Sequence, residues 1–167
     1  SWQASLLAEN LVEQEGIDII EAQEYEAPLY YLQLRRALGF GPKRCPPCVV
    51  HLHSPSEFIA RHNDWDISLP DILTAKRLED YSIAASDALL CPSRYLARQV
   101  ETWHGLQEGS IFVIPYPMGD SLTLERDKNT WEQGTICYAG RLERRKGIIE
   151  WTDAAVAVAR NYPSAHF

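Results

Sequence analysis

The sequence contains five short apolar runs, and segments with a helical pattern separate most of them. Each run is nearly continuous rather than alternating, which is typical of parallel strands that are covered on both faces. The runs span residues 17–22, 48–53, 88–91, 111–114 and 136–139. The helical patterns span residues 1–15, 28–38, 70–86, 94–103 and 148–162. This alternation predicts a doubly wound α/β fold, with a Rossmann-like parallel sheet and flanking helices.

Helix-capping residues follow two of the predicted strands. Ser54 stands in a capping position, with Pro55 at the first helical position and Glu57 three residues after the cap. Ser93 follows the run at residues 88–91 and is predicted to cap the next helix. Ligands bind at the carboxyl edge of open α/β sheets, so we expect the functional residues in these turns.

The composition excludes some classes of protein. The 167 residues are 46% hydrophobic and 23% charged, as expected of a globular chain, and the formal net charge is −7. An acidic chain is a poor nucleic-acid binder, because phosphate contacts favour a basic face. No apolar run approaches the roughly 18 residues that a membrane span needs.

Four cysteines include one CxxC pair, formed by Cys45 and Cys48; the others are Cys91 and Cys137. A structural zinc site would need a second pair, or two histidines at ligand spacing. The pair also runs into an apolar strand, whereas a thioredoxin-like motif opens a helix. Reduced cysteines in a cytoplasmic protein are the simpler interpretation.

One basic segment, GRLERRKG at residues 140–147, stands out in the acidic chain, because four of the 16 Lys and Arg residues fall within six positions of it. It follows an apolar run and precedes a helical pattern. Gly140 would let the backbone approach a ligand, Arg141 offers a planar fork for phosphate oxygens, and Lys146 adds a point charge. Next to a helix N-terminus, these residues predict a phosphate or diphosphate site. A solvated basic turn without a ligand is the alternative.

The second candidate cluster is an HxH pair. His53 ends a predicted strand, and His51 shares its face. The pair allows three interpretations: a metal site, a structural histidine, or a substrate contact by His53. Residues that would complete a metal site are Asp64, Asp66 and His62. Three acidic residues follow the first predicted strand without an evident partner: Glu21, Glu24 and Glu26.

A domain boundary is predicted after the fourth apolar run. Residues 115–120 contain two prolines and a glycine, and a polar stretch follows as far as residue 134. We therefore expect one α/β unit at residues 1–116, a linker at residues 117–134, and the start of a second unit at residues 135–167.

Taken in order, these segments resemble the retaining glycosyltransferases of family 4, which have the GT-B fold. Residues 49–55 resemble the family's segment with the active-site histidine, and residues 88–100 resemble the strand, serine and helix that follow. Residues 114–120 resemble the interdomain turn. Residues 138–147 resemble the strongest signature of the family, GRL-x-x-x-KG.

The resemblance implies a partial GT-B fold: the second half of the N-terminal, acceptor-side domain and the start of the C-terminal domain that binds the nucleotide sugar. It implies transfer of a hexose from a nucleotide diphosphate sugar to a glycan or lipid-linked acceptor, without a metal or other cofactor. Arg141 and Lys146, with Gly140, would bind the diphosphate and stabilise the leaving phosphate. His53 would contact the transferred sugar, and Ser93 would bind substrate.

Two family elements do not occur in this sequence: an amino-terminal glycine-rich loop and a pair of glutamates that hold the donor sugar. We therefore expect the chain to be part of a longer protein and to be inactive, or nearly so, alone. From the family we expect a role in polysaccharide biosynthesis, in the cytoplasm or at the inner face of the membrane. The alternatives are a metal-dependent hydrolase that uses the HxH pair, and a non-catalytic module that binds a nucleotide or sugar phosphate.

Overall fold

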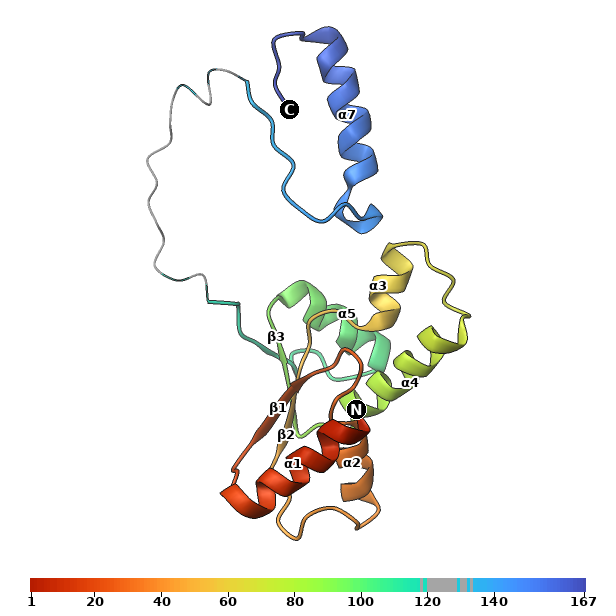
Figure 1. Cartoon of the computed structure of the whole chain (residues 1–167), viewed down its shortest axis with the longest axis vertical. Coiled ribbons are helices and arrows are strands. Elements are labelled where there is room, and N and C mark those ends of the chain that lie inside the picture. Colours follow the sequence, from red (N-terminus) through yellow and green to blue (C-terminus); the bar gives the residue numbers. More distant parts are fainter. Residues whose placement is uncertain (118, 120–128, 130–131, 133) are drawn as a thin grey trace. The chain divides into compact units, whose positions relative to one another are not determined.

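The computed structural model describes residues 1–117, 119, 129, 132 and 134–167. The chain divides into two compact units, Ser1–Pro117 and Met118–Phe167 (Figure 1). Most of the predicted linker at residues 117–134 lies outside the described residues, so the predicted domain boundaries stay a prediction. In the part of the chain that is described, no helix is long and apolar enough to cross a membrane.

The first unit is an α/β unit with a four-stranded sheet whose strands all run parallel, in the order β1-β2-β3-β4. Its elements are α1 (Trp2–Glu15), β1 (Ile20–Gln23), α2 (Tyr30–Ala37), β2 (Cys48–His51), α3 (Ser56–His62), α4 (Pro70–Ala84), β3 (Ala88–Cys91), α5 (Arg94–His104) and β4 (Phe112–Val113). The predicted Rossmann-like parallel sheet with flanking helices is confirmed. Apart from β3, the strands are shorter than the apolar runs that predicted them.

The core of this unit lies on one face of the sheet. The strand register places Val50 of β2 beside Leu89 of β3, and both side chains are buried. Residues from three helices join them in one buried cluster: Leu32 from α2, Ile83 from α4 and Val100 from α5. The helices and the sheet are therefore held together by a continuous apolar core.

The opposite face of the sheet is more open. Glu21 and Gln23 of β1 are exposed there, and Phe112 of β4 is 63% exposed. The strand order has no reversal, and right-handed crossovers that all add strands in one direction place their helices on one face. The described strands therefore wind in one direction, and the expectation that both faces are covered is not met in the described part of the chain.

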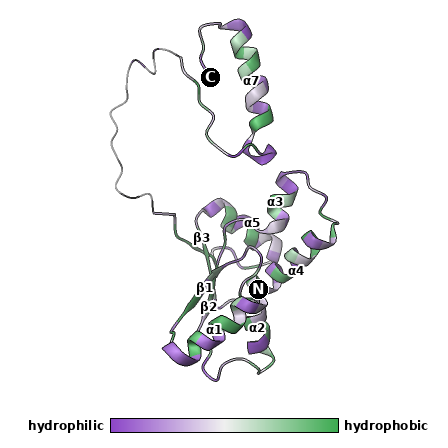
Figure 2. Cartoon of the chain, viewed as in Figure 1, coloured by the Kyte–Doolittle hydropathy of each residue, from purple (hydrophilic) through white to green (hydrophobic). Residues whose placement is uncertain are grey.

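The second unit contains a short 3₁₀ helix, η1 (Arg144–Lys146), followed by α7 (Ile148–Asn161). Figure 2 shows apolar residues along α7, but none of its residues is buried. The predicted strand at residues 136–139 is wrong. A strand needs a partner along its length, and here only Thr135 pairs with His166, in an isolated parallel bridge.

Candidate functional site

His53 lies two residues beyond the end of β2, at the carboxyl edge of the sheet. Its ring stacks on the rings of His51 and Tyr116, with centroids 4.6 Å and 5.7 Å away, and its Nδ1 hydrogen-bonds with the Tyr116 hydroxyl. Burial lowers the pKa of His53, and the neighbouring His51 lowers it further. The lowered pKa favours the neutral form of the ring, which is suited to hydrogen bonds with hydroxyl groups.

The side chain of His51 pairs with that of Glu21 on the neighbouring strand β1, where Glu21 is the partner of Val49 in the strand register. The distance from Nδ1 of His51 to the Glu21 carboxylate is 3.0 Å. Nε2 of His51 is buried, and it has no hydrogen-bond partner among the described residues. Of the three acidic residues that were predicted to follow the first strand, Glu21 lies within β1 and has a side-chain partner that the sequence did not reveal.

The geometry gives no support to a metal site at the HxH pair. Among the described residues, no group of three His, Cys, Asp or Glu side chains is placed to hold a metal ion. His62 instead hydrogen-bonds through Nδ1 to the carbonyl of Phe58, at 2.8 Å. Asp66 accepts hydrogen bonds from the backbone and hydroxyl of Ser68. The described residues therefore lend the hydrolase alternative no metal-binding geometry.

A fully buried carboxylate holds the backbone of His53. Glu24 lies just after β1 and has no exposed surface. The N–H of His53 lies 2.8 Å from both Glu24 carboxylate oxygens, and the N–H of Ser54 donates to one of them at 2.5 Å. The end of β1 is thereby tied to the turn after β2.

A second buried carboxylate holds the start of α3. Glu79 of α4 is 1% exposed and accepts the N–H of Ser56 at 2.7 Å and the Ser56 hydroxyl at 2.5 Å. It also accepts the N–H of Glu26, at 3.1 Å. The predicted cap by Ser54 is wrong: α3 begins at Ser56 without a side-chain cap from its own segment. The reason is that Glu79, from a different helix, takes the N–H that a local cap would have accepted.

Neither carboxylate is predicted from the sequence as a part of the site. Glu24 is one of the three acidic residues noted near the first predicted strand, but the sequence alone does not indicate what its carboxylate contacts. Glu79 lies on the core side of α4, next to buried Ser82 and Ile83, and nothing local distinguishes it. Burial raises the pKa of Glu24 and of Glu79, and hydrogen bonds from backbone N–H groups offset part of the effect.

Ser93 caps α5, as predicted. Ser93 lies two residues beyond the end of β3, and its hydroxyl oxygen accepts the N–H of Leu96 at 3.3 Å. Ser93 and His53 thus follow neighbouring parallel strands at the same edge of the sheet. The role of Ser93 in binding substrate stays a prediction.

The basic turn of the second unit is closed by Tyr138. Its hydroxyl lies 2.9 Å from the carbonyl oxygen of Arg141 and 3.3 Å from that of Lys146, so one side chain connects both ends of the turn. The Tyr138 ring packs near Trp151 of α7, with 5.5 Å between centroids. A Cβ at Gly140 would lie 3.3 Å from the hydroxyl, so glycine makes room for this contact. The predicted approach of a ligand to the Gly140 backbone stays a prediction.

Two cations of the turn share one carboxylate. Arg141 pairs with Glu143 at 2.8 Å, and Arg145 pairs with the same carboxylate at 3.0 Å. The Arg141 side chain remains 69% exposed. Gly147 follows Lys146 with φ of 73° and leads the chain directly into α7. An anion at this turn would meet Arg141, Lys146 and the first N–H groups of a helix.

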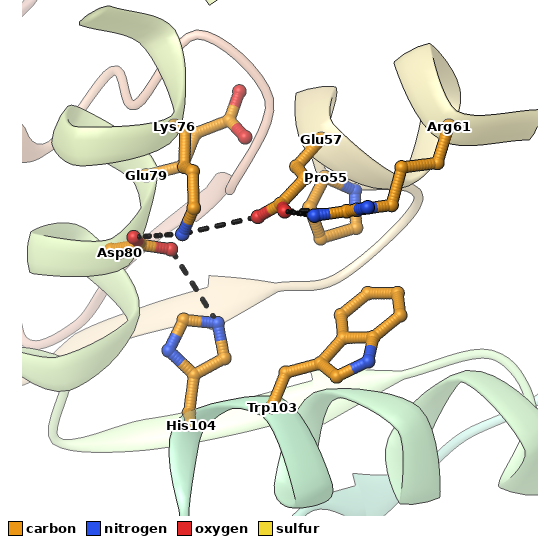
Figure 3. Close-up of a pocket in the computed structure, with 8 residues that line it drawn as sticks. All are labelled: Pro55, Glu57, Arg61, Lys76, Glu79, Asp80, Trp103 and His104. Atoms are coloured by element: carbon orange, nitrogen blue, oxygen red, sulfur yellow. Dashed lines mark hydrogen bonds and ion pairs between the residues drawn. The ribbon is translucent and has the colours of Figure 1, made fainter. Parts of the chain in front are cut away.

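The cavity between α3, α4 and α5 contains none of the predicted site residues. It measures about 320 Å³, and Figure 3 shows that the Lys76, Arg61, Glu57 and Asp80 side chains pair with one another across it. Lys76 lies 3.1 Å from Glu57 and 2.5 Å from Asp80, and Arg61 lies 2.5 Å from Glu57. Because these charges are already satisfied, we assign the cavity no ligand.

All four cysteines are free in the structure. Cys48 and Cys91 are buried, and Cys137 is exposed. Burial raises the pKa of the Cys48 thiol to about 11, although the nearby Arg36 works against the shift. The CxxC pair runs into β2, as predicted, and its second thiol is a poor nucleophile.

Comparison with known proteins gives one family. Residues 1–118 match the family model described as Glycosyltransferase Family 4. No curated protein matches the chain. The matched residues include His53, Ser93 and both buried carboxylates, and they end before the basic turn.

Proposed function

Because this chain belongs to glycosyltransferase family 4, we propose that it serves retaining transfer of a sugar from a nucleotide diphosphate sugar to a glycan or lipid-linked acceptor. The observation that carries the proposal is the family match over residues 1–118. The basic turn at residues 140–147 supplies the matching anion site in the second unit.

In this proposal the basic turn binds the diphosphate of the donor. During transfer, the bond from the anomeric carbon to the diphosphate oxygen breaks, and the oxygen of an acceptor hydroxyl takes its place on the same face of the sugar while its proton passes to the departing diphosphate. Negative charge then grows on the leaving phosphate. Arg141, Lys146 and the N-terminus of α7 stabilise that charge, and this lowers the energy of the transition state.

In this proposal the turns after β2 and β3 of the first unit bind the sugar. The lowered pKa of His53 favours its neutral form, so it hydrogen-bonds to a sugar hydroxyl without adding charge to the site. Its Nδ1 is already engaged by Tyr116, which leaves Nε2 as the atom for the sugar. Ser93 contributes at the end of the neighbouring strand. No step of this proposal requires a metal.

The diphosphate role is tested by titrating inorganic diphosphate and nucleoside diphosphates into the 167-residue chain, followed by NMR. Arg141→Ala and Lys146→Ala should each weaken binding about tenfold or more, because a hydrogen bond to a charged group contributes about 1.5–3 kcal/mol. Arg160→Ala is the matched control, because Arg160 lies in the last turn of α7. Unchanged binding by both turn variants would remove the diphosphate from this site.

Transfer itself needs a separate assay, because a non-catalytic binding module would also bind diphosphate. Release or transfer of sugar from a panel of nucleotide sugars is measured by mass spectrometry. We expect little or no turnover by the 167-residue chain, because the family's paired glutamates do not occur in it. In any longer protein that contains the chain, tight donor binding without release or transfer would favour the binding module.

A further inference from the structure

We propose that Glu24 and Glu79 are positioning residues: together they hold the backbone of residues 53–56 and thereby fix the place of the His53 ring. That the ring is held for a sugar rests on the proposed function, whereas the positioning itself rests on geometry alone. The two carboxylates come from different parts of the fold, the end of β1 and the middle of α4.

Glu24 acts on the residue that carries the ring. The N–H of His53 points between its two carboxylate oxygens, 2.8 Å from each, and the next N–H is 2.5 Å from one of them. A carboxylate that accepts from both N–H groups sets the direction in which the chain leaves β2. A displacement of Glu24 would therefore move the Cα of His53, and the ring with it.

Glu79 fixes the other end of the same turn. It accepts the N–H and the hydroxyl of Ser56 and also the N–H of Glu26. The turn after β2 is thus tied to the turn after β1. Pro55 has no N–H, so every backbone N–H in residues 53–56 donates to one of the two carboxylates.

Burying two carboxylates has an unfavourable free energy. No Lys or Arg pairs with Glu24 or Glu79 in the described part of the chain. Burying such a group is unfavourable unless hydrogen bonds compensate, and here the compensation comes from N–H groups of the turn. If the turn changed conformation, each buried carboxylate would lose its N–H donors and become unsatisfied. This cost holds the turn in one conformation.

The same arrangement closes the turn to phosphate. Convergent N–H groups between a strand and a helix are a common binding site for anions. In this chain the protein's own carboxylates occupy those N–H groups. The turn after β2 therefore positions His53 but has no N–H group available for an anionic ligand, which must bind elsewhere.

The test compares Glu24 with a second buried glutamate that serves a distant segment. Glu101 of α5 is 5% exposed and accepts the N–H of Ile111 at 3.2 Å. Glu24→Gln removes the charge, whereas Glu24→Asp keeps the charge and withdraws it by one methylene. Both should abolish the NMR contact between the His53 and Tyr116 rings. Glu101→Gln and Glu101→Asp should leave that contact unchanged.

The paired substitutions separate three roles. A purely electrostatic role predicts that only Glu24→Gln changes the His53 signals, and a purely stabilising role predicts lower stability with an unchanged ring contact. Either result overturns the proposal. If a Glu24 variant does not fold, Glu79→Gln and Glu79→Asp decide the matter by the same contact.

Failure of the proposed function gives a different pattern. If His53→Ala leaves sugar transfer unchanged in a longer active protein, the sugar contact is wrong. The ring contact in the Glu24 variants would still report on positioning, because it is measured without substrate.

Discussion

The turn that carries His53 and the turn that carries Arg141 are held in different ways. The first is tied by two buried carboxylates above a continuous apolar core. The second is closed by the Tyr138 hydroxyl and by an ion pair to Glu143, on a unit whose α7 has no buried residue. The turn that carries His53 is therefore preorganised by long-range contacts, whereas the basic turn depends on contacts within a few residues.

Packing explains the difference. In the first unit, helices α2, α4 and α5 contribute to one core. In the second unit, an open groove of about 710 Å³ lies where a core would form, beside Ile136, Val158 and Tyr162. Small units that bury little apolar surface are only marginally stable. The basic turn is therefore expected to be less rigid than the turn that carries His53.

The largest expected effect comes from the same substitution made in both units. Val50 of β2 is fully buried, whereas Val156 of α7 is 46% exposed. Val50→Ala should lower the free energy of unfolding of the first unit by about 2–3 kcal/mol, through lost burial and a cavity. Val156→Ala should change stability by less than about 0.5 kcal/mol, because its side chain is half exposed and alanine favours helix. Amide hydrogen exchange reports on each unit separately, and equal effects would contradict the contrast.

A smaller effect is expected at the basic turn. Tyr138→Phe removes the hydroxyl that connects the carbonyl groups of Arg141 and Lys146. The loss of one hydrogen bond contributes about 0.5–1.5 kcal/mol, so affinity for inorganic diphosphate should fall about two- to tenfold. Tyr162→Phe, in the same unit, is the control. An unchanged affinity would show that the turn does not need its closing contact.

The smallest effect concerns pH and isolates the buried carboxylates. Burial raises the pKa of Glu24 above that of the unfolded chain, so its contribution to stability is present at acid pH and is lost as pH rises through the folded pKa. Glu24→Gln lacks this titration. The amount by which the wild type is more stable than the variant should therefore be larger near pH 5 than near pH 8. Denaturant unfolding at the two pH values measures it, and a difference that grows with pH would contradict the argument.

Local features of this site could be predicted from the sequence. The run at residues 88–91 matches β3, because an apolar segment in the middle of a sheet has partners on both sides. Ser93 was identified as a cap because its acceptor contact is three residues away. The basic turn before α7 was likewise visible in the order of its residues.

Features that depend on distant contacts could not be predicted. Glu79 takes the place of a local cap from 23 residues away, and no spacing rule connects it to Ser56. The run at residues 136–139 has the composition of a strand, but only Thr135 finds a bridge partner. The one-directional winding follows from the strand order, which alternation along the sequence does not determine.

The distribution of the free cysteines makes the molecule easy to label. Cys137 is exposed and stands next to Tyr138, whereas Cys48 is buried with a pKa of about 11. Thiol reagents attack the exposed, ionised form, so a dye or spin label can be directed to the basic turn. Cys45 is free and partly exposed, so a Cys45→Ser variant leaves Cys137 as the exposed thiol among the four, and a label there reports on the basic turn without an added cysteine.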